Sequence, residues 1–228
     1  AERGPELLLE AGLADALQAN VTRINAIPSM LDGALGGAAL ETAIMDHARR
    51  VSDAVLDAIQ NGMFPVIIGG DHTSALGFHT GLARAHGKTG IIWVDTHPDL
   101  NTPETSPSGN IHGMPLAGLL GRGSEKMLET TAPCRISEEH VAMDVVKERG
   151  LSACLASAVN TANQAEAGYG LSIDIDAIDP SQAPFVATPV DGGLDADELA
   201  NVLSTLPNKD RLLGLEGTEF TPREGEPE

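Results

Sequence analysis

The sequence predicts an α/β protein with a parallel sheet covered by helices on both faces. Short apolar runs, typical of fully buried strands, alternate along the chain with longer stretches that have helical periodicity. Polar side chains follow each apolar run, as in open α/β sheets, where ligands bind beyond the carboxyl ends of the strands. No internal repeat or linker divides the 228 residues, so we expect one domain over residues 1–228.

The first half of the chain contains two predicted helices and two predicted strands. Apolar residues at spacings of three and four predict a helix over 43–61, with the face Ile44, Ala48, Val51, Val55 and Ile59. A strand buried on both faces is expected over 64–68. A second helix runs to about residue 85, and the second buried strand spans 91–94.

The second half repeats this alternation. The remaining predicted elements are a polar loop over 100–110, helices over 145–168 (interrupted at Gly150) and 195–206, and strands over 171–176 and 212–215. The loop leads to His112 and a short helix, and the last strand ends near Glu219. Strands and helices that alternate in this way form a parallel sheet between two helical layers.

Charge and composition exclude several classes of protein. With 33 acidic against 14 basic residues, the net charge of −19 argues against a nucleic-acid partner. No apolar run reaches the roughly 18 residues that a membrane span needs. Cys134 and Cys154 have no CxxC or Cys-His context and are expected to be buried thiols. The beginning of the sequence does not form a signal peptide, so we expect a cytoplasmic protein.

The acidity has two interpretations. The first is a solvated acidic surface that keeps the protein soluble. The alternative is adaptation to high salt, where screening relieves the repulsion between carboxylates.

Six side chains of metal-ligand type follow three predicted strands: His72, Asp95, His97, Asp99, Asp174 and Asp176. The segment 95–99 has ligand-type residues at alternate positions, which point the same way if the chain is extended. Four carboxylates are too many to bury without cations, so we expect two divalent ions that share bridging carboxylates. By contrast, His47, His79 and His86 lie in or at the ends of helical stretches and are expected to serve surface or packing roles.

The ligand set indicates the metal and the chemistry. Imidazole and carboxylate ligands without thiolate favour Mn²⁺, Zn²⁺ or Fe²⁺ over Ca²⁺. Two such ions a few ångströms apart lower the pKa of a shared water, which makes hydroxide available near neutral pH. The sequence therefore predicts metal-assisted hydrolysis.

The motifs resemble those of the ureohydrolase family, which comprises the arginases and agmatinases, and are most similar to the arginases. They are Gly69-Gly70-Asp71-His72, Asp95-Thr96-His97-Pro98-Asp99, and Ser172-Ile173-Asp174-Ile175-Asp176 followed by Asp179-Pro180. The resemblance covers about 62–121 and 171–222. It implies a three-layer α/β/α fold, two Mn²⁺ per subunit, and a homotrimer or homohexamer.

The resemblance also implies a role for each ligand and an overall reaction. His72, Asp95, Asp99 and Asp174 would hold one Mn²⁺, and Asp95, His97, Asp174 and Asp176 the other. A hydroxide between the ions would attack the guanidinium carbon of L-arginine and give L-ornithine and urea. Asp99, His112 and Glu219 are the expected catalytic residues, with His112 as the proton shuttle to the leaving amine and Glu219 as the partner of the guanidinium.

The loop after the second strand bears on substrate choice. Residues 101–113 are similar to the arginase form, which recognises an amino acid rather than a bare amine. A substrate α-carboxylate needs neutral or positive donors in an anionic site, and the loop offers Asn101, Ser106, Ser108 and Asn110. Thr188 matches a threonine that lines the substrate.

The sequence departs from the family pattern in three places. The family's first strand and last helix, and a segment near 142–143, are expected to be missing, and with that segment an aspartate that binds the substrate α-amino group. Ala187 and Gly217 are unusual residues at their positions. An agmatinase-like or guanidino-acid ureohydrolase, and a non-catalytic metal-binding relative, are therefore the alternatives to an arginase.

Overall fold

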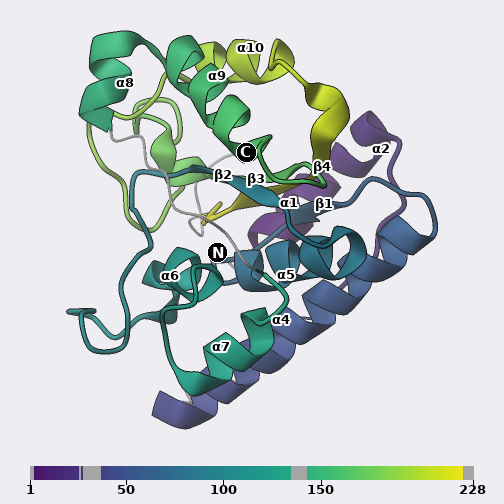
Figure 1. Ribbon diagram of the computed structural model, residues 1–228. Coiled ribbons are helices and arrows are strands. Elements are labelled where there is room, and N and C mark those ends of the chain that lie inside the picture. Colours follow the sequence, from purple (N-terminus) through teal and green to yellow (C-terminus); the bar gives the residue numbers. More distant parts are fainter. Residues whose placement is uncertain (1–2, 26, 28–36, 135–142, 223–228) are drawn as a thin grey trace.

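The computed structural model describes residues 3–25, 27, 37–134 and 143–222 (Figure 1). Four strands form one parallel sheet in the order β1-β4-β3-β2. The strands are β1 (Val66–Ile68), β2 (Gly90–Val94), β3 (Tyr169–Asp174) and β4 (Leu212–Thr218). Because all four run in the same direction, their carboxyl ends meet at one edge. The predicted α/β fold with a parallel sheet is confirmed.

Helices cover both faces of this sheet (Figure 1). One face carries α4 (Gly37–Gln60), α5 (Ser74–His86), α6 (Pro115–Leu119) and α7 (Glu125–Thr131). The other carries α8 (Met143–Arg149), α9 (Leu151–Ala162) and α10 (Ala196–Ser204). The remaining elements are α1 (Gly4–Glu10), α2 (Leu13–Leu17) and the 3-10 turns η1 (Ile111–Gly113), η2 (Ile175–Ala177) and η3 (Lys209–Arg211). The described chain therefore has the expected three layers.

The alternation of side chains along β2 shows how the sheet divides the core. Ile92 and Val94 pack into the cluster formed with α9 and α10. Ile91 and Trp93 point to the opposite face, against the cluster formed with α4 and α5. This period of two is what a strand with both faces covered requires.

Close contact between α4 and α5 depends on two glycines of α5, Gly77 and Gly81. A Cβ added at Gly77 would lie 2.4 Å from the carbonyl oxygen of Ala48, and one added at Gly81 would lie 2.6 Å from the Cβ of Val55. Without side chains at these positions the two helices pack tightly. The packing fixes α5, whose first turn follows His72, one of the expected metal ligands.

Strand β1 differs from its prediction. It begins at Val66 rather than at residue 64, and Phe64 and Val66 are 53% and 36% exposed, so the expectation of burial on both faces is wrong. The physical reason is that helices cover only one face of β1: Ile67 packs against the cluster from α4 and α5, whereas the neighbouring Val66 points to the other face and is exposed.

Several helix boundaries also differ from their predictions. The first long helix begins at Gly37, earlier than expected. The interruption at Gly150 is confirmed, and its φ of +83° explains why a glycine separates α8 from α9. Helix α9 ends at Ala162, short of residue 168, and the 195–206 helix is the shorter α10.

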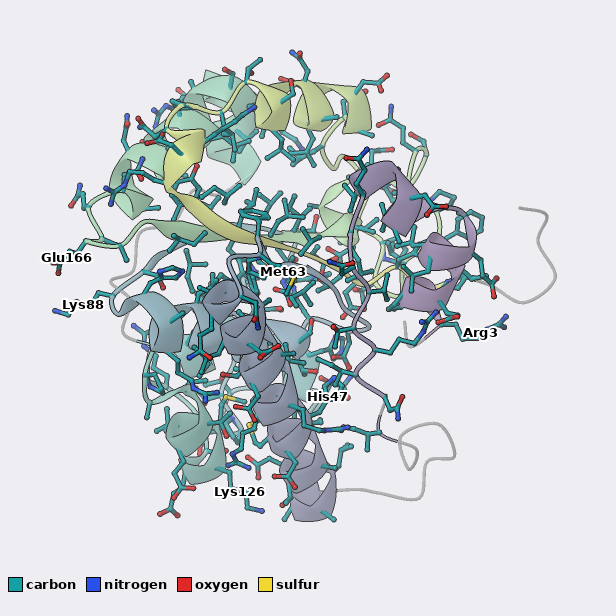
Figure 2. The ribbon with its side chains drawn as sticks, turned by 90° about the vertical axis from the view of Figure 1, so that its right-hand side faces the viewer. Arg3, His47, Met63, Lys88, Lys126 and Glu166 are labelled. Atoms are coloured by element: carbon teal, nitrogen blue, oxygen red, sulfur yellow. The ribbon has the colours of Figure 1, made fainter. Side chains whose placement is uncertain are left out.

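The side chains assigned to packing behave largely as expected. His79 is fully buried, His86 is exposed, and His47 is half-buried on the side of α4 that faces the segment after α2 (Figure 2). Cys134 and Cys154 are buried thiols, and burial raises the pKa of Cys134 to about 12. Among the described helices, none combines the length and apolar character needed to cross a membrane.

Candidate metal centre

The residues expected to bind metal lie at the carboxyl edge of the sheet. Figure 2 shows Lys88 and Glu166, which precede β2 and β3, together at the opposite edge. Three of the expected ligands follow β2, two lie at the end of β3 and in η2, and the histidine that precedes α5 follows β1. The structure brings all six side chains into one cluster: His72, Asp95, His97, Asp99, Asp174 and Asp176.

His72 lies at the centre of the first half of this cluster. Its Nδ1 is 3.0 Å from Oδ2 of Asp95 and 3.1 Å from Oδ2 of Asp174. Oδ2 of Asp99 lies 3.3 Å from the same nitrogen. One imidazole nitrogen therefore faces three carboxylates that come from two different strands.

His97 forms the second half, and Asp95 belongs to both halves. The Nδ1 of His97 is 3.0 Å from Oδ2 of Asp176 and 3.7 Å from Oδ1 of Asp95. Two groups, each with ligand atoms close enough to hold one metal ion, contain Asp95: one with His72 and Asp99, the other with His97 and Asp176. Asp95 thus offers one oxygen to each group, which is the arrangement of a bridging carboxylate.

The local backbone differs from the expected extended path. Oδ1 of Asp95 accepts a hydrogen bond from the backbone N–H of His97 at 2.6 Å, and Oδ1 of Asp174 accepts one from Asp176 at 2.8 Å. Each aspartate therefore forms a tight turn with the residue two positions on. The expectation that side chains align because the chain is extended is wrong, since these turns, rather than strand geometry, bring the alternate residues together.

Asp99 occupies an unusual backbone conformation. Its φ of +48° lies in the left-handed region, which residues other than glycine rarely adopt. Its carbonyl oxygen accepts a hydrogen bond from the backbone N–H of Ala117 at 3.1 Å, which ties it to α6. Such conformations persist where the surrounding structure holds them, and they concentrate at functional sites.

The electrostatics of the cluster fit divalent cations. Burial raises the pKa of the carboxyl groups of Asp99, Asp174 and Asp176 above the ordinary range. Burial alone would lower the pKa of His72, but its contacts with three carboxylates raise it well above the ordinary value. Oδ1 of Asp176 is buried and has no hydrogen-bond partner among the described residues. A cation would compensate these charges and satisfy that oxygen.

Two residues that the sequence did not single out contact the cluster. Ser172 Oγ lies 2.9 Å from Nε2 of His72. Trp93 stacks on the His72 ring with the ring centroids 4.0 Å apart, and its Nε1–H donates to Oδ2 of Asp95 at 3.0 Å. Each lies two residues before a predicted ligand on a strand, so the period-two alternation was the signal that could have found them.

His112 and Glu219 form a pair beside the cluster. The Nδ1 of His112 is 3.4 Å from Oε1 of Glu219, and this interaction raises the pKa of His112 above its ordinary value. Glu219 has a φ of +64°; its backbone N–H donates to the carbonyl of Gly70 at 2.8 Å, and its Oε1 accepts from the backbone N–H of His72 at 3.0 Å. The carboxylate is therefore fixed from both its backbone and its side chain.

Thr188 and the loop residues have different surroundings. The Thr188 hydroxyl donates to Oδ2 of Asp176 at 2.9 Å, so it contacts an expected metal ligand. In the loop between β2 and α6, which runs outward in Figure 1, Ser106 Oγ accepts from Gly109 N at 3.0 Å and Ser108 Oγ accepts from Asn110 N at 3.2 Å.

These loop residues do not reach the cluster directly. Oδ1 of Asn101 accepts from Thr105, and the backbone N–H of Asn101 donates to the carbonyl of Gly113, beside His112. Among the described residues, no hydrogen bond or ion pair joins Asn101, Ser106, Ser108 or Asn110 to the six expected ligands. In the described structure, the loop therefore contacts the site only near its two ends, through the backbone hydrogen bond between Asn101 and Gly113.

One of the expected departures from the family pattern can be compared with the structure, and another lies beside residues that it does not describe. The segment expected to be missing near 142–143 adjoins residues 135–142, which lie outside the described residues. A Cβ at Gly217 would meet nothing within 4 Å, so nothing in the described structure requires a glycine there.

Comparison with known proteins decides the family. The family model described as "Arginase family" matches residues 1–227. The chain belongs to the arginase family. The arginase of Bacillus caldovelox is 34% identical over 205 residues, which cover 79% of this chain and 69% of that protein. The arginase of Bacillus subtilis is 35% identical over 205 residues, with the same coverage.

Solved structures of arginases have the same fold. The crystal structure of the Bacillus subtilis arginase aligns with a TM-score of 0.81 and 30% identity over 96% of this chain and 84% of that chain. The Entamoeba histolytica arginase in complex with L-ornithine aligns with a TM-score of 0.83 and 25% identity over 99% and 87%. The resemblance to the ureohydrolases, and to arginases in particular, is therefore confirmed, and the protein is an arginase-type hydrolase.

Proposed function

We propose that the protein binds two Mn²⁺ ions and hydrolyses L-arginine to L-ornithine and urea. The observation that carries this proposal is that Asp95 belongs to two groups of ligand atoms at once. The proposed ligands are His72, Asp95, Asp99 and Asp174 for one ion, and Asp95, His97, Asp174 and Asp176 for the other. Ions bound there would lower the pKa of a shared water and so supply hydroxide near neutral pH.

The donor set supports Mn²⁺. Carboxylate and imidazole donors suit this ion, and the cluster contains no thiolate. Cys134 is buried in the hydrophobic cluster that contains residues of α4 and α5, and Cys154 is buried on α9.

Glu219 is suited to bind the guanidinium group of the substrate. A carboxylate is the matching partner for that planar cation, because it can accept two parallel hydrogen bonds. Its backbone tie to Gly70 and its bond from the His72 backbone fix the direction of the carboxylate before substrate arrives. Glu219 is only 4% exposed, so its pairing with the guanidinium would take place away from bulk water.

His112 is suited to deliver a proton to the leaving amine. Its hydrogen bond to Glu219 raises its pKa, so a larger fraction of the ring is protonated near neutrality. The ring is half-buried at the edge of the site, where it can exchange protons with solvent. A group that titrates in this range is an effective general acid.

The loop after β2, together with Thr188, is the proposed binding site for the amino-acid end of the substrate. We assign Asn101, Ser106, Ser108, Asn110 and Thr188 to substrate binding. The hydroxyl hydrogens and amide groups of the loop provide neutral donors for an α-carboxylate in an anionic site. The similar Entamoeba histolytica arginase was crystallised with L-ornithine, the amino-acid product proposed here.

The test is urea release by the Mn²⁺-preincubated protein, with L-arginine and agmatine as parallel substrates. Urea from L-arginine alone is the expected result. Urea from agmatine alone would keep the metal assignment but overturn the amino-acid specificity, in favour of an agmatinase-like enzyme. Urea from neither would contradict the proposal and favour another guanidino acid as substrate.

A variant of the loop sharpens this test. Ser108→Ala removes a donor proposed for the α-carboxylate, so it should raise KM for L-arginine. Agmatine has no α-carboxylate, and its residual turnover, if measurable, should not respond to the substitution. An unchanged KM for L-arginine would remove Ser108 from the substrate site.

Location and assembly complete the proposal. We infer a cytoplasmic homotrimer or homohexamer, as the family resemblance implies. Light scattering on the purified protein gives its mass in solution, and a monomer would contradict the proposed assembly.

A further inference from the structure

A buried carboxylate beneath the metal site, Glu216, has no part in the mechanism above. It is 0% exposed in the middle of β4. In the sheet Glu216 is in register with Ser172 of β3, and Ser172 is in register with Trp93 of β2. These three side chains thus form one row across the sheet, under His72.

The partners of Glu216 are two hydroxyl groups. Its Oε2 accepts from Ser172 Oγ at 2.7 Å, and its Oε1 accepts from Ser74 Oγ at 2.7 Å. Among the described residues, it makes no ion pair with a lysine or arginine. A carboxylate that is buried with hydroxyl partners alone is costly, so its presence in the core calls for a specific role.

The hydrogen-bond directions show what this carboxylate controls. Ser172 Oγ donates its single hydroxyl proton to Oε2 of Glu216. The Ser172 oxygen can then only accept from Nε2 of His72, 2.9 Å away. A histidine binds metal as the neutral imidazole, and with its proton on Nε2 that form has its lone pair on Nδ1. That nitrogen is the one that faces the three carboxylates of the metal cluster.

We propose that Glu216 is a positioning residue that acts through Ser172 to hold His72 with its proton on Nε2 and its Nδ1 lone pair directed at the metal. The inference rests on the proposed metal-dependent function. A partner that binds the outer nitrogen of a ligand histidine fixes the tautomer and ring orientation, and it increases the basicity of the ligand. Stacking of Trp93 on His72 adds a second constraint on the ring plane.

The two serines provide a matched pair of variants. Ser172→Ala breaks the link between Glu216 and His72. Ser74→Ala removes the other hydroxyl partner of the same carboxylate, and Ser74 has no hydrogen bond to any of the six expected ligands in the described part of the chain. Glu216→Gln removes the charge while it keeps the shape of the side chain.

The readout is Mn²⁺ affinity, measured without any turnover. The sequence has one tryptophan, Trp93, and it contacts both His72 and Asp95. Its fluorescence therefore reports on the metal site when metal-free protein is titrated with Mn²⁺, and calorimetry provides an independent dissociation constant. Thermal melting of each metal-free variant measures the structural cost of each substitution separately.

We expect Ser172→Ala and Glu216→Gln to weaken Mn²⁺ binding by about 10- to 100-fold, the usual effect of removing a partner of a ligand histidine. Ser74→Ala should leave the dissociation constant unchanged even if it lowers the melting temperature. Equal affinity in all three variants, or equal loss in Ser74→Ala and Ser172→Ala, would overturn the proposal. If Ser172→Ala does not fold, the Mn²⁺ dissociation constants of Glu216→Gln and Ser74→Ala are compared instead. Weaker binding in Glu216→Gln alone supports the proposal, and equal binding in the two variants overturns it.

The same titration separates this inference from the proposed function. An unsubstituted protein that binds no Mn²⁺ would overturn the proposed metal centre and the positioning role together. An unsubstituted protein that binds Mn²⁺ but releases no urea would overturn the proposed reaction alone, and the comparison of variants would still decide the role of Glu216.

Discussion

Replacing His79 by leucine should remove a loss of stability that the protein undergoes in acid. His79 is fully buried in α5, between Phe78 and Trp93, with ring centroids 4.7 Å and 6.3 Å away. Neither of its ring nitrogens has a hydrogen-bond partner among the described residues. Burial, with a smaller contribution from the charge of His72, lowers its pKa to about 3.

The size of the effect follows from the difference in pKa between the folded and unfolded chains. An unfolded histidine has a pKa of about 6.5, so between that value and about 3 the unfolded chain binds a proton that the folded chain does not. The free energy of unfolding therefore decreases as the pH falls below about 6.5, by about 1.4 kcal/mol per pH unit. At about pH 5 the loss amounts to about 2 kcal/mol relative to pH 8.

The assay is urea unfolding of the metal-free protein at these two pH values. Metal-free protein is needed because metal binding is itself pH-dependent. The acid loss of His79→Leu should be about 2 kcal/mol smaller than that of the unsubstituted protein. His86→Gln, at an exposed position, is the control and should leave the acid loss unchanged. An equal acid loss in His79→Leu and in the unsubstituted protein would refute this reasoning.

Three further predictions concern the metal centre, the helix packing and the substrate partner. Because burial raises the pKa of Asp99 and Asp174, Mn²⁺ must displace protons from the cluster, so its affinity should fall as the pH is lowered. Calorimetry in buffers of different ionisation enthalpy measures that proton release, and finding none would contradict the expectation. Gly77→Ala should lower the free energy of unfolding by about 1–3 kcal/mol, because its Cβ would lie 2.4 Å from the carbonyl of Ala48; an unchanged urea midpoint would contradict the packing argument. Glu219→Gln should lower kcat/KM for L-arginine while Mn²⁺ affinity is retained, and a loss of Mn²⁺ instead would assign Glu219 to the metal.

The architecture was predictable because its causes are local. The three- and four-residue spacing on α4 and the apolar runs of β2 and β3 identify those elements, although α4 begins six residues before its predicted start. The approximate location of the candidate metal centre was predictable for a topological reason: ligand-type residues that follow parallel strands gather at one edge of the sheet.

The remaining features depend on long-range contacts or on turn geometry. The exposure of β1 depends on which of its faces the helices cover, and the sequence contains no direct record of that packing. The turns at Asp95 and Asp174 arise because an aspartate side chain accepts a backbone hydrogen bond two residues on, which overrides the extended path. Ser172 and Glu216 are 44 residues apart, so their contact follows only once β3 and β4 are known to be neighbours.

The shared position of Asp95 is the central feature of the proposed site, and metal stoichiometry tests it most directly. Equilibrium dialysis against Mn²⁺, followed by elemental analysis, counts the ions bound per chain. We expect two ions in the unsubstituted protein, and loss of both the ions and urea release in Asp95→Asn, because both groups of ligand atoms contain this carboxylate. One ion or none in the unsubstituted protein, or full Mn²⁺ occupancy with undiminished turnover in Asp95→Asn, would contradict this expectation.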